Sequence, residues 1–180
     1  MHEMASYATK VIKRFVEGKR NMVKIKLNHI LLAIAAILAV LCFFSIYSPV
    51  RFGREKAERE AAVKAKLMEI RRAEEAFRKA NGVYAGSFSQ LAGAGLLADS
   101  MRYVPYGEGA EFELSVTISR GQSGSMTPLM ECGAPYESYL NGLDENLIRE
   151  LTEKADEKGE YPGLRIGDTT TPNDNAGNWE

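Results

Sequence analysis

The chain has 180 residues, with 23 Lys and Arg side chains against 24 Asp and Glu, two Cys and two His. That length suits one folded domain with an appendage rather than two full domains. The formal net charge of −1 argues against a general nucleic-acid-binding protein. Cys42, Cys132, His2 and His29 are too few and too scattered for a disulfide scaffold or a His/Cys zinc site. Composition alone therefore excludes most metalloenzymes.

The charges are distributed unevenly along the chain. Residues 1–29 carry seven basic and two acidic side chains, whereas residues 81–180 carry six basic and sixteen acidic ones. Gradients of this kind usually indicate that the basic end meets a membrane or another polyanion. We therefore expect a basic tail over residues 1–29 and an acidic domain at the other end.

An apolar segment follows the basic tail. Residues 30–47 read ILLAIAAILAVLCFFSIY, eighteen residues without a charge. At a rise of about 1.5 Å per residue this run is roughly 27 Å long, close to the thickness of a bilayer core. No good cleavage site follows it, so the segment has the features of an uncleaved signal anchor. The sequence predicts a transmembrane helix over residues 30–48.

The basic residues give this predicted span an orientation. Seven Lys and Arg precede the span and six follow it closely, so the counts nearly tie. The basic residues before the span are barely offset by acidic ones, which favours a cytoplasmic amino terminus. The predicted location is the bacterial inner membrane, in a single-pass protein. Its cytoplasmic tail is expected at residues 1–29 and its outer, periplasmic domain at residues 82–180.

A second helix is predicted over residues 50–81. Pro49 should kink or break the helix just after the apolar segment. Asn81-Gly82 should end the second helix. Between them, apolar residues recur at steps of three or four and form one narrow stripe: Val63, Leu67, Ile70, Ala73, Phe77 and Ala80. The charged pairs Arg71-Arg72 and Glu74-Glu75 fit a solvated face. We expect a juxtamembrane stalk whose far end packs on a small domain.

The remaining residues predict short helices and strands. Strict alternation over residues 111–119, EFELSVTIS, and a return strand at residues 126–132 predict a β-hairpin with one buried face. Asp144 should cap a helix that ends at Gly159, and a brief strand is expected around residues 164–166. The predicted fold class is α+β: a single amino-terminal transmembrane helix continues into a long stalk helix packed on a small antiparallel β-sheet.

Two segments resemble a known family. Residues 67–97, LMEIRRAEEAFRKANGVYAGSFSQLAGAGLL, are similar to the end of the long helix and the first loop of type II secretion pseudopilins. Residues 166–179, IGDTTTPNDNAGNW, resemble the closing loop of the major pseudopilin. The resemblance implies a pilin-like domain that works by protein–protein contact, without catalysis, in a bacterial type II secretion or type IV pilus-like machine.

The amino-terminal region departs from the pattern of that family. A prepilin has a short leader ending in Gly and a Glu five residues into the apolar segment. Here Gly18 is followed by Lys19 and Arg20, and no acidic residue enters residues 27–47. No prepilin cleavage motif is recognisable, so we expect the domain to stay anchored. The alternative is a processed pseudopilin filament subunit with calcium in its carboxy-terminal loop.

The resemblance also implies a metal site. The closing loop of the major pseudopilin holds a structural Ca²⁺, and Asp168, Asp174 and Asn175 stand where ligands of that loop would fall. Calcium usually takes six to eight oxygens, so an Asn at position 175 weakens the match. The same residues also fit a polar Asx-turn loop without metal, held by Trp179 and Pro172. No other cofactor is expected.

No constellation of catalytic residues is recognisable. The sequence has no Gly-x-Ser-x-Gly elbow, no phosphate loop and no cysteine with a plausible histidine partner. We expect no enzyme activity, no small-molecule substrate and no nucleic-acid partner. The expected partners are the membrane, other secretion or pilus machinery proteins and a second copy of the chain, with these candidate contact aromatics: Tyr103, Tyr106, Tyr136 and Tyr139. A stand-alone anchored periplasmic binding module is the remaining alternative.

Overall fold

The computed structural model describes the backbone of residues 2–120 and 125–180, and the side chains of residues 26–42, 50–120 and 125–180. The chain divides into two compact units, Met1–Arg51 and Phe52–Glu180. One helix, α1 (His2–Asn81), contributes to both units. The helix break expected at Pro49 is wrong, because residue 49 is helical like its neighbours. A proline removes one backbone donor, but its fixed φ is compatible with a helix.

In the first unit, the described part of α1 is exposed along its whole length. Every side chain from residue 26 to residue 42 is exposed. The large apolar ones are Leu27, Ile30, Leu31, Leu32, Ile34, Ile37, Leu38, Val40 and Leu41. Leu and Ala are good helix formers, so this stretch is helical without burying its apolar surface in the described part of the chain.

A membrane-spanning helix is not found. Among the described residues, no helix is both long and apolar enough to cross a bilayer. The described part of the apolar run, residues 30–42, is about 20 Å long, against about 30 Å for the hydrocarbon core of a bilayer. Residues 43–48 of the predicted span lie outside the described side chains, as do residues 1–25 of the basic tail. This finding contradicts the predicted transmembrane helix over residues 30–48 and the single-pass inner-membrane location inferred from it.

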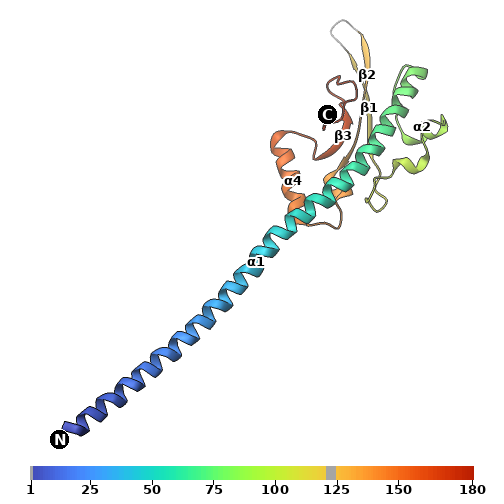
Figure 1. Cartoon of the computed structure of the whole chain (residues 1–180). Coiled ribbons are helices and arrows are strands. Elements are labelled where there is room, and N and C mark those ends of the chain that lie inside the picture. Colours follow the sequence, from blue (N-terminus) through green and yellow to red (C-terminus); the bar gives the residue numbers. More distant parts are fainter. Residues whose placement is uncertain (1, 121–124) are drawn as a thin grey trace. The chain divides into compact units, whose positions relative to one another are not determined.

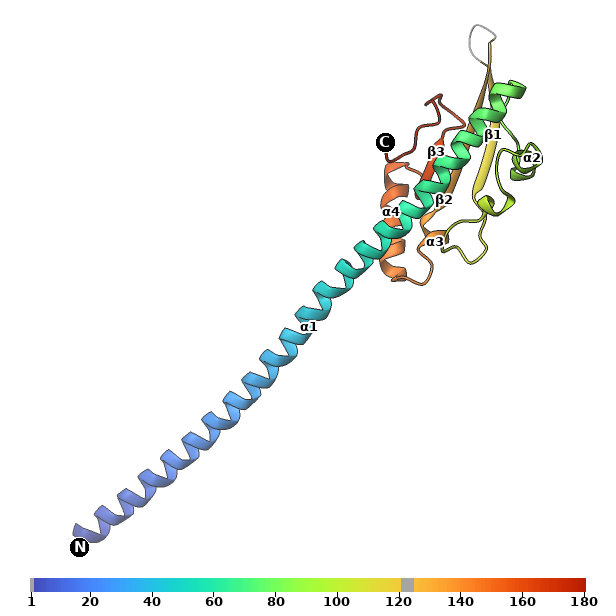
Figure 2. The same ribbon diagram turned by 45° about the vertical axis from the view of Figure 1, so that its right-hand side comes forward.

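The second unit is an α+β fold in which the end of α1 lies across an antiparallel sheet (Figures 1 and 2). The sheet has the order β1-β2-β3, with bounds β1 (Glu113–Arg120), β2 (Met126–Pro135) and β3 (Gly163–Gly167). Val116 lies opposite Met130, and Cys132 lies opposite Ile166. The hairpin expected from the alternating pattern is therefore present, with a return strand that runs three residues further than expected. Its apolar face is not fully buried as predicted, because Ile118 is 54% exposed.

The described part of the second unit also contains four short helices, of which α4 has clear signals at both of its ends. They are α2 (Phe88–Gly93), the 3-10 helix η1 (Asp99–Arg102), α3 (Tyr136–Tyr139) and α4 (Glu145–Lys158). The Asp144 carboxylate accepts hydrogen bonds from the amides of Asn146 and Leu147, and Gly159 ends α4 in the left-handed conformation at φ 67°. This cap and stop place α4 where the sequence predicted it.

The core lies between α1 and the sheet. Val63, Leu67 and Ile70 are fully buried on the helix side, and Met130, Cys132 and Ile166 are fully buried on the sheet side. Burial of each large aliphatic side chain contributes about 1.5–3 kcal/mol to stability. Most of the stripe predicted within residues 50–81 is thus buried in this core, but Ala80 at its end is exposed.

Candidate functional site

The carboxy-terminal segment, residues 168–180, is called the closing loop below. It brings the three residues of the predicted metal site together: Asp168, Asp174 and Asn175 line one cavity of about 70 Å³. Arg78 and Tyr84, from the end of α1 and the loop after it, line the same cavity. The cavity is therefore formed between segments about 90 residues apart in the sequence.

Asp168 is engaged in a turn directly after β3. Its Oδ1 accepts hydrogen bonds from the amide of Thr170 at 2.7 Å, the hydroxyl of Thr170, and the amide of Thr171 at 3.1 Å. Its Oδ2 faces the guanidinium of Arg165 at 3.5 Å. The hydroxyl and amide of Thr170 stabilise the carboxylate and lower the pKa of Asp168 below its usual value. Asp168 thus forms the Asx turn that the sequence offered as the alternative to a metal site.

Asp174 and Asn175 are fixed by contacts with other segments. Both adopt the left-handed conformation, at φ 54° and 55°. The buried Asn175 amide is hydrogen-bonded to the Tyr84 hydroxyl, with Nδ2 at 2.9 Å. Arg71 Nη2 donates to the Asp174 carbonyl oxygen at 3.0 Å, and Arg71 Nη1 pairs with Glu180 at 3.1 Å. α1 and the loop after it therefore hold the closing loop through Arg71 and Tyr84.

The surroundings of this cavity bear on the predicted calcium site. Arg78 lies over the Tyr84 ring and donates to its hydroxyl at 2.8 Å, so a guanidinium stands beside the three candidate ligands. In the part of the chain that the structure describes, no group of three His, Cys, Asp or Glu residues is placed to hold a metal ion. Calcium usually needs more carboxylate oxygens than this arrangement offers. Calcium binding by Asp168, Asp174 and Asn175 stays a prediction.

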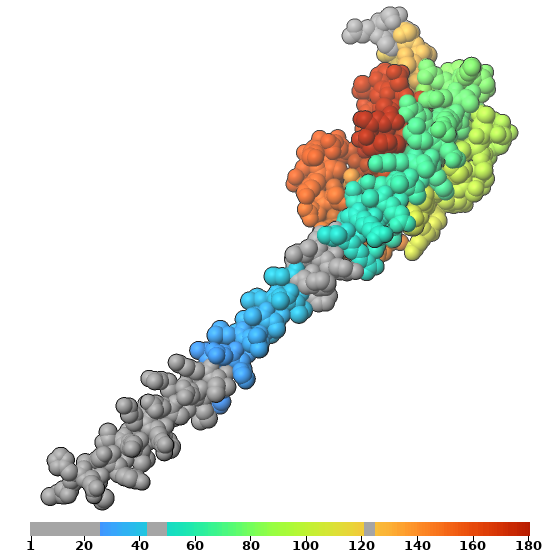
Figure 3. Space-filling view, in the orientation of Figure 1, coloured from blue at the N-terminus to red at the C-terminus, as the bar shows by residue number. Residues whose placement is uncertain are grey.

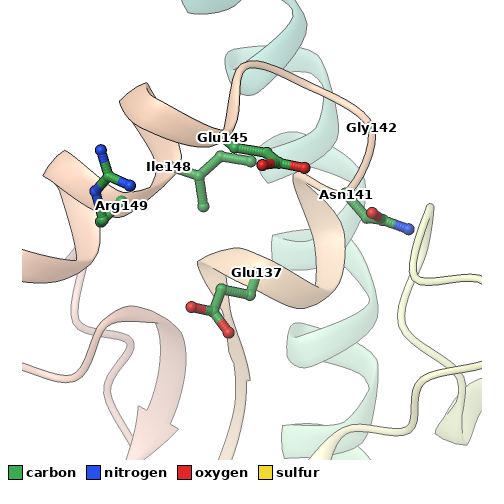
Figure 4. Close-up of a pocket in the computed structure, with 6 residues that line it drawn as sticks. All are labelled: Glu137, Asn141, Gly142, Glu145, Ile148 and Arg149. Atoms are coloured by element: carbon green, nitrogen blue, oxygen red, sulfur yellow. The ribbon is translucent and has the colours of Figure 1, made fainter.

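A second, larger cavity lies between α3 and α4. It has a volume of about 290 Å³ and is lined by Glu137, Asn141, Gly142, Glu145, Ile148 and Arg149. Figure 4 shows Ile148 pointing into the gap between the two helices, whereas the Arg149 guanidinium points away from Glu137. The two carboxylates come from different helices and do not converge. This surface is suited to contact with a protein side chain rather than to acid–base catalysis.

α1 fixes the turn that forms one wall of the larger cavity. Arg59 Nη1 donates to the carbonyl oxygens of Tyr139 at 3.0 Å and Asn141 at 2.8 Å. Sequence analysis missed this cavity, because its lining is spread over two short elements and the glycine-containing turn between them. Only the acidic character of α4 was visible in the sequence.

The four candidate contact tyrosines all have neighbours within the second unit. Lys56 lies 5.9 Å from the ring centre of Tyr136, Arg59 lies 5.0 Å from that of Tyr106, and Arg102 lies 4.9 Å from that of Tyr103. Tyr139 is fully buried, and burial raises the pKa of its hydroxyl. Such cation–π contacts contribute about 0.5–1 kcal/mol each at exposed positions. Only Tyr106, at 49% exposure, offers a largely open ring.

Glu74 is a buried titratable residue that sequence analysis placed on a solvated face. It is completely buried, its Oε2 accepts a hydrogen bond from the Ala85 amide at 2.8 Å, and its Oε1 has no hydrogen-bond partner among the described residues. Burial, partly opposed by the Ala85 hydrogen bond, raises the pKa of Glu74 to about 7. Glu74 therefore anchors the loop after α1, and the predicted solvated face is wrong at this position.

Cys132 belongs to the core of the second unit. It is fully buried in the sheet, and burial raises the pKa of its thiol. A thiol in this state is a poor nucleophile.

Comparisons of the chain with protein-family models, with curated proteins and with solved structures found no match.

Proposed function

We propose that this protein is a non-enzymatic, pilin-like subunit that acts by protein–protein contact in a type II secretion or type IV pilus-like machine. One observation carries the proposal: the end of α1 lies across an antiparallel sheet, and the closing loop is tied back to that helix by Arg71. The resemblance to pseudopilins depends on two of these parts, the end of α1 with the loop after it and the closing loop.

The chemistry of the cavities supports a binding role over a catalytic one. The cavity at the closing loop holds an arginine and a hydrogen-bonded tyrosine, and the cavity between α3 and α4 has carboxylates that do not converge. The cavity between α3 and α4 is lined by two glutamates, one arginine and the apolar Ile148, and this net negative charge suits contact with a basic side chain on another protein. The acidic surface of α4 extends this face.

Identification of copurifying proteins tests the proposal. A carboxyl-tagged full-length chain is crosslinked in its native cells, purified gently and analysed by mass spectrometry. Recovery of a secretion or pilus ATPase, a platform protein or a channel is the expected result. Recovery of the chain without such components would contradict the proposal and favour an independent binding module.

A matched pair of variants connects the test to the structure. Glu145→Lys reverses a charge at the cavity between α3 and α4, whereas Glu153→Lys makes the same change further along α4, outside that cavity. If this cavity binds a machine component, the first variant should recover about threefold less of it than the second, which corresponds to about 0.65 kcal/mol. Equal recovery would exclude the cavity as the contact.

An intact mass distinguishes the remaining alternative. A processed filament subunit would lack the basic tail and would be lighter than the full chain. A mass of 19.9 kDa for the protein isolated from cells would exclude processing.

A further inference from the structure

β1 forms an open edge of the sheet. It is the first strand in the order β1-β2-β3 and pairs with β2 on one side only. The chain just before β1 is already flanked, because the Arg102 carbonyl accepts the Phe112 amide at 2.8 Å and Tyr103 bridges Glu111. The ends of β1 and β2 next to the hairpin turn reach beyond α1 and β3 (Figures 1 and 3). The free edge of β1 therefore begins near Ser115.

This edge lacks the features that usually keep sheet edges from pairing. Native edge strands are commonly protected by charges, prolines or bulges. Residues 114–119 read LSVTIS, with no charge, no proline and no glycine, and Val, Thr and Ile favour extended backbone. Ile118, at 54% exposure, is a large apolar side chain left uncovered on this strand. Nothing in the sequence of this edge therefore prevents another strand from pairing with it.

The pattern of β1 is complementary to itself. Val116 and Ile118 lie on the face that carries Met130 and Pro128 of β2, and Ser115, Thr117 and Ser119 lie on the other face. In an antiparallel pairing centred on Thr117, Val116 faces Ile118 of the second copy and Ser115 faces Ser119. Apolar pairs and hydroxyl pairs of this kind stabilise neighbouring strands, and no like charges meet.

A competing register is disfavoured by the surrounding structure. A pairing centred on Val116 would place Arg120 of the second copy opposite Phe112. The Phe112 amide is already taken by the Arg102 carbonyl, so it could not pair with the backbone of Arg120 from the second copy. A one-residue shift in register also changes which face each side chain occupies.

We propose that two copies of this chain associate through β1, in an antiparallel pairing centred on Thr117, to form one continuous sheet. The self-complementary strand identifies the second copy as the occupant of the edge. This association is independent of the pilin-like function, because it depends only on β1 and its surroundings.

Cysteine crosslinking of the full chain tests both the contact and its register. All variants carry Cys42→Ser, which removes the exposed thiol, while the buried Cys132 is kept. Across an antiparallel pair, opposite Cα atoms lie about 4.5–5.5 Å apart, within the range of a disulfide. Thr117→Cys should therefore form a disulfide dimer with itself under mild oxidation. Glu153→Cys, on the exposed surface of α4, is the control for random collision.

Cysteines at two further positions test the register of the pairing. Residues 115 of the two copies would lie about 14 Å apart, so Ser115→Cys alone should not crosslink above the control. A mixture of Ser115→Cys and Ser119→Cys chains should crosslink, because these positions face each other. We expect the Thr117→Cys dimer to exceed the Glu153→Cys dimer by at least about fivefold. Equal yields at these two positions, or self-crosslinking by Ser115→Cys alone, would overturn the proposal.

Discussion

Two stretches of α1 differ in the burial of their apolar side chains, although both are helical. In residues 26–42 every described side chain is exposed, whereas in residues 52–81 the stripe formed by Val63, Leu67 and Ile70 is fully buried. The first stretch has the larger apolar surface, yet only the second meets a sheet in the described chain. Helix propensity accounts for both stretches being helical. Burial follows from a matching tertiary surface and not from hydrophobicity alone.

The largest expected effect comes from making the same Leu→Ala substitution in each stretch and comparing the loss of stability. Leu67→Ala removes a fully buried side chain and should lower the free energy of unfolding of the second unit by about 3 kcal/mol. Leu31→Ala, at a position that is 54% exposed, should change it by less than about 0.5 kcal/mol. Denaturant unfolding followed by the fluorescence of Trp179, the single tryptophan, measures both. Equal losses would mean that Leu31 is packed as firmly as Leu67.

The next largest effect is on the pH dependence of stability, and it should differ between two adjacent glutamates. The Glu74 carboxyl is buried with a pKa raised from 4.5 to about 7, whereas the Glu75 side chain is 48% exposed. A raised folded-state pKa stabilises the protonated form, so this stabilisation is complete below pH 4.5 and is lost as the pH rises to about 7. Glu74→Gln should abolish this decline and exceed the wild-type stability at pH 8 by about 2 kcal/mol.

The control for this pH dependence is Glu75→Gln, which should keep the decline between pH 4.5 and pH 7. Denaturant unfolding at several pH values between 4.5 and 8 measures all three proteins. A Glu74→Gln variant that is less stable than wild type at pH 8 would show that the ionised carboxylate is needed in the fold.

Local patterns predicted much of the second unit. The alternation of β1, the stripe of α1 and the signals at Asp144 and Gly159 each act within a few residues, so they can be recognised without tertiary information. The prediction of the membrane span depended on the length of an apolar run, and the described part of that run is too short.

The roles of Arg71 and Glu74 could not be predicted in this way. From the sequence of the helix alone, both residues lie among charged neighbours and are predicted to be exposed to solvent. Their partners are the closing loop and the Ala85 amide, which later segments bring to α1. The three residues of the predicted metal site line one cavity, and the guanidinium of Arg78 beside them comes from α1.

Removing either of two tyrosine hydroxyls should have a smaller effect on the free energy of unfolding. Tyr84→Phe removes the partner of the buried Asn175 amide and should cost about 1–2 kcal/mol of unfolding free energy. Tyr161→Phe removes a hydroxyl that donates to the exposed Glu113 carboxylate and should cost less than about 0.5 kcal/mol. Hydrogen exchange of the Ala176 amide should also accelerate in the first variant only. Unchanged exchange in Tyr84→Phe would mean that the Tyr84 hydroxyl does not hold the closing loop in place.

The smallest expected effect is that of calcium on the closing loop. Asp168 Oδ1 already accepts two backbone amides, and Arg71 and Arg78 place positive charge beside Asp174 and Asn175. We therefore expect millimolar calcium to raise the Tm by less than about 1 °C relative to chelator. A ligand present at about 100 times its Kd would add roughly 2.7 kcal/mol and shift the Tm by several degrees. Such a shift with calcium but not magnesium, absent in Asp168→Asn, would establish the metal site and favour the calcium-binding filament subunit over the proposed function.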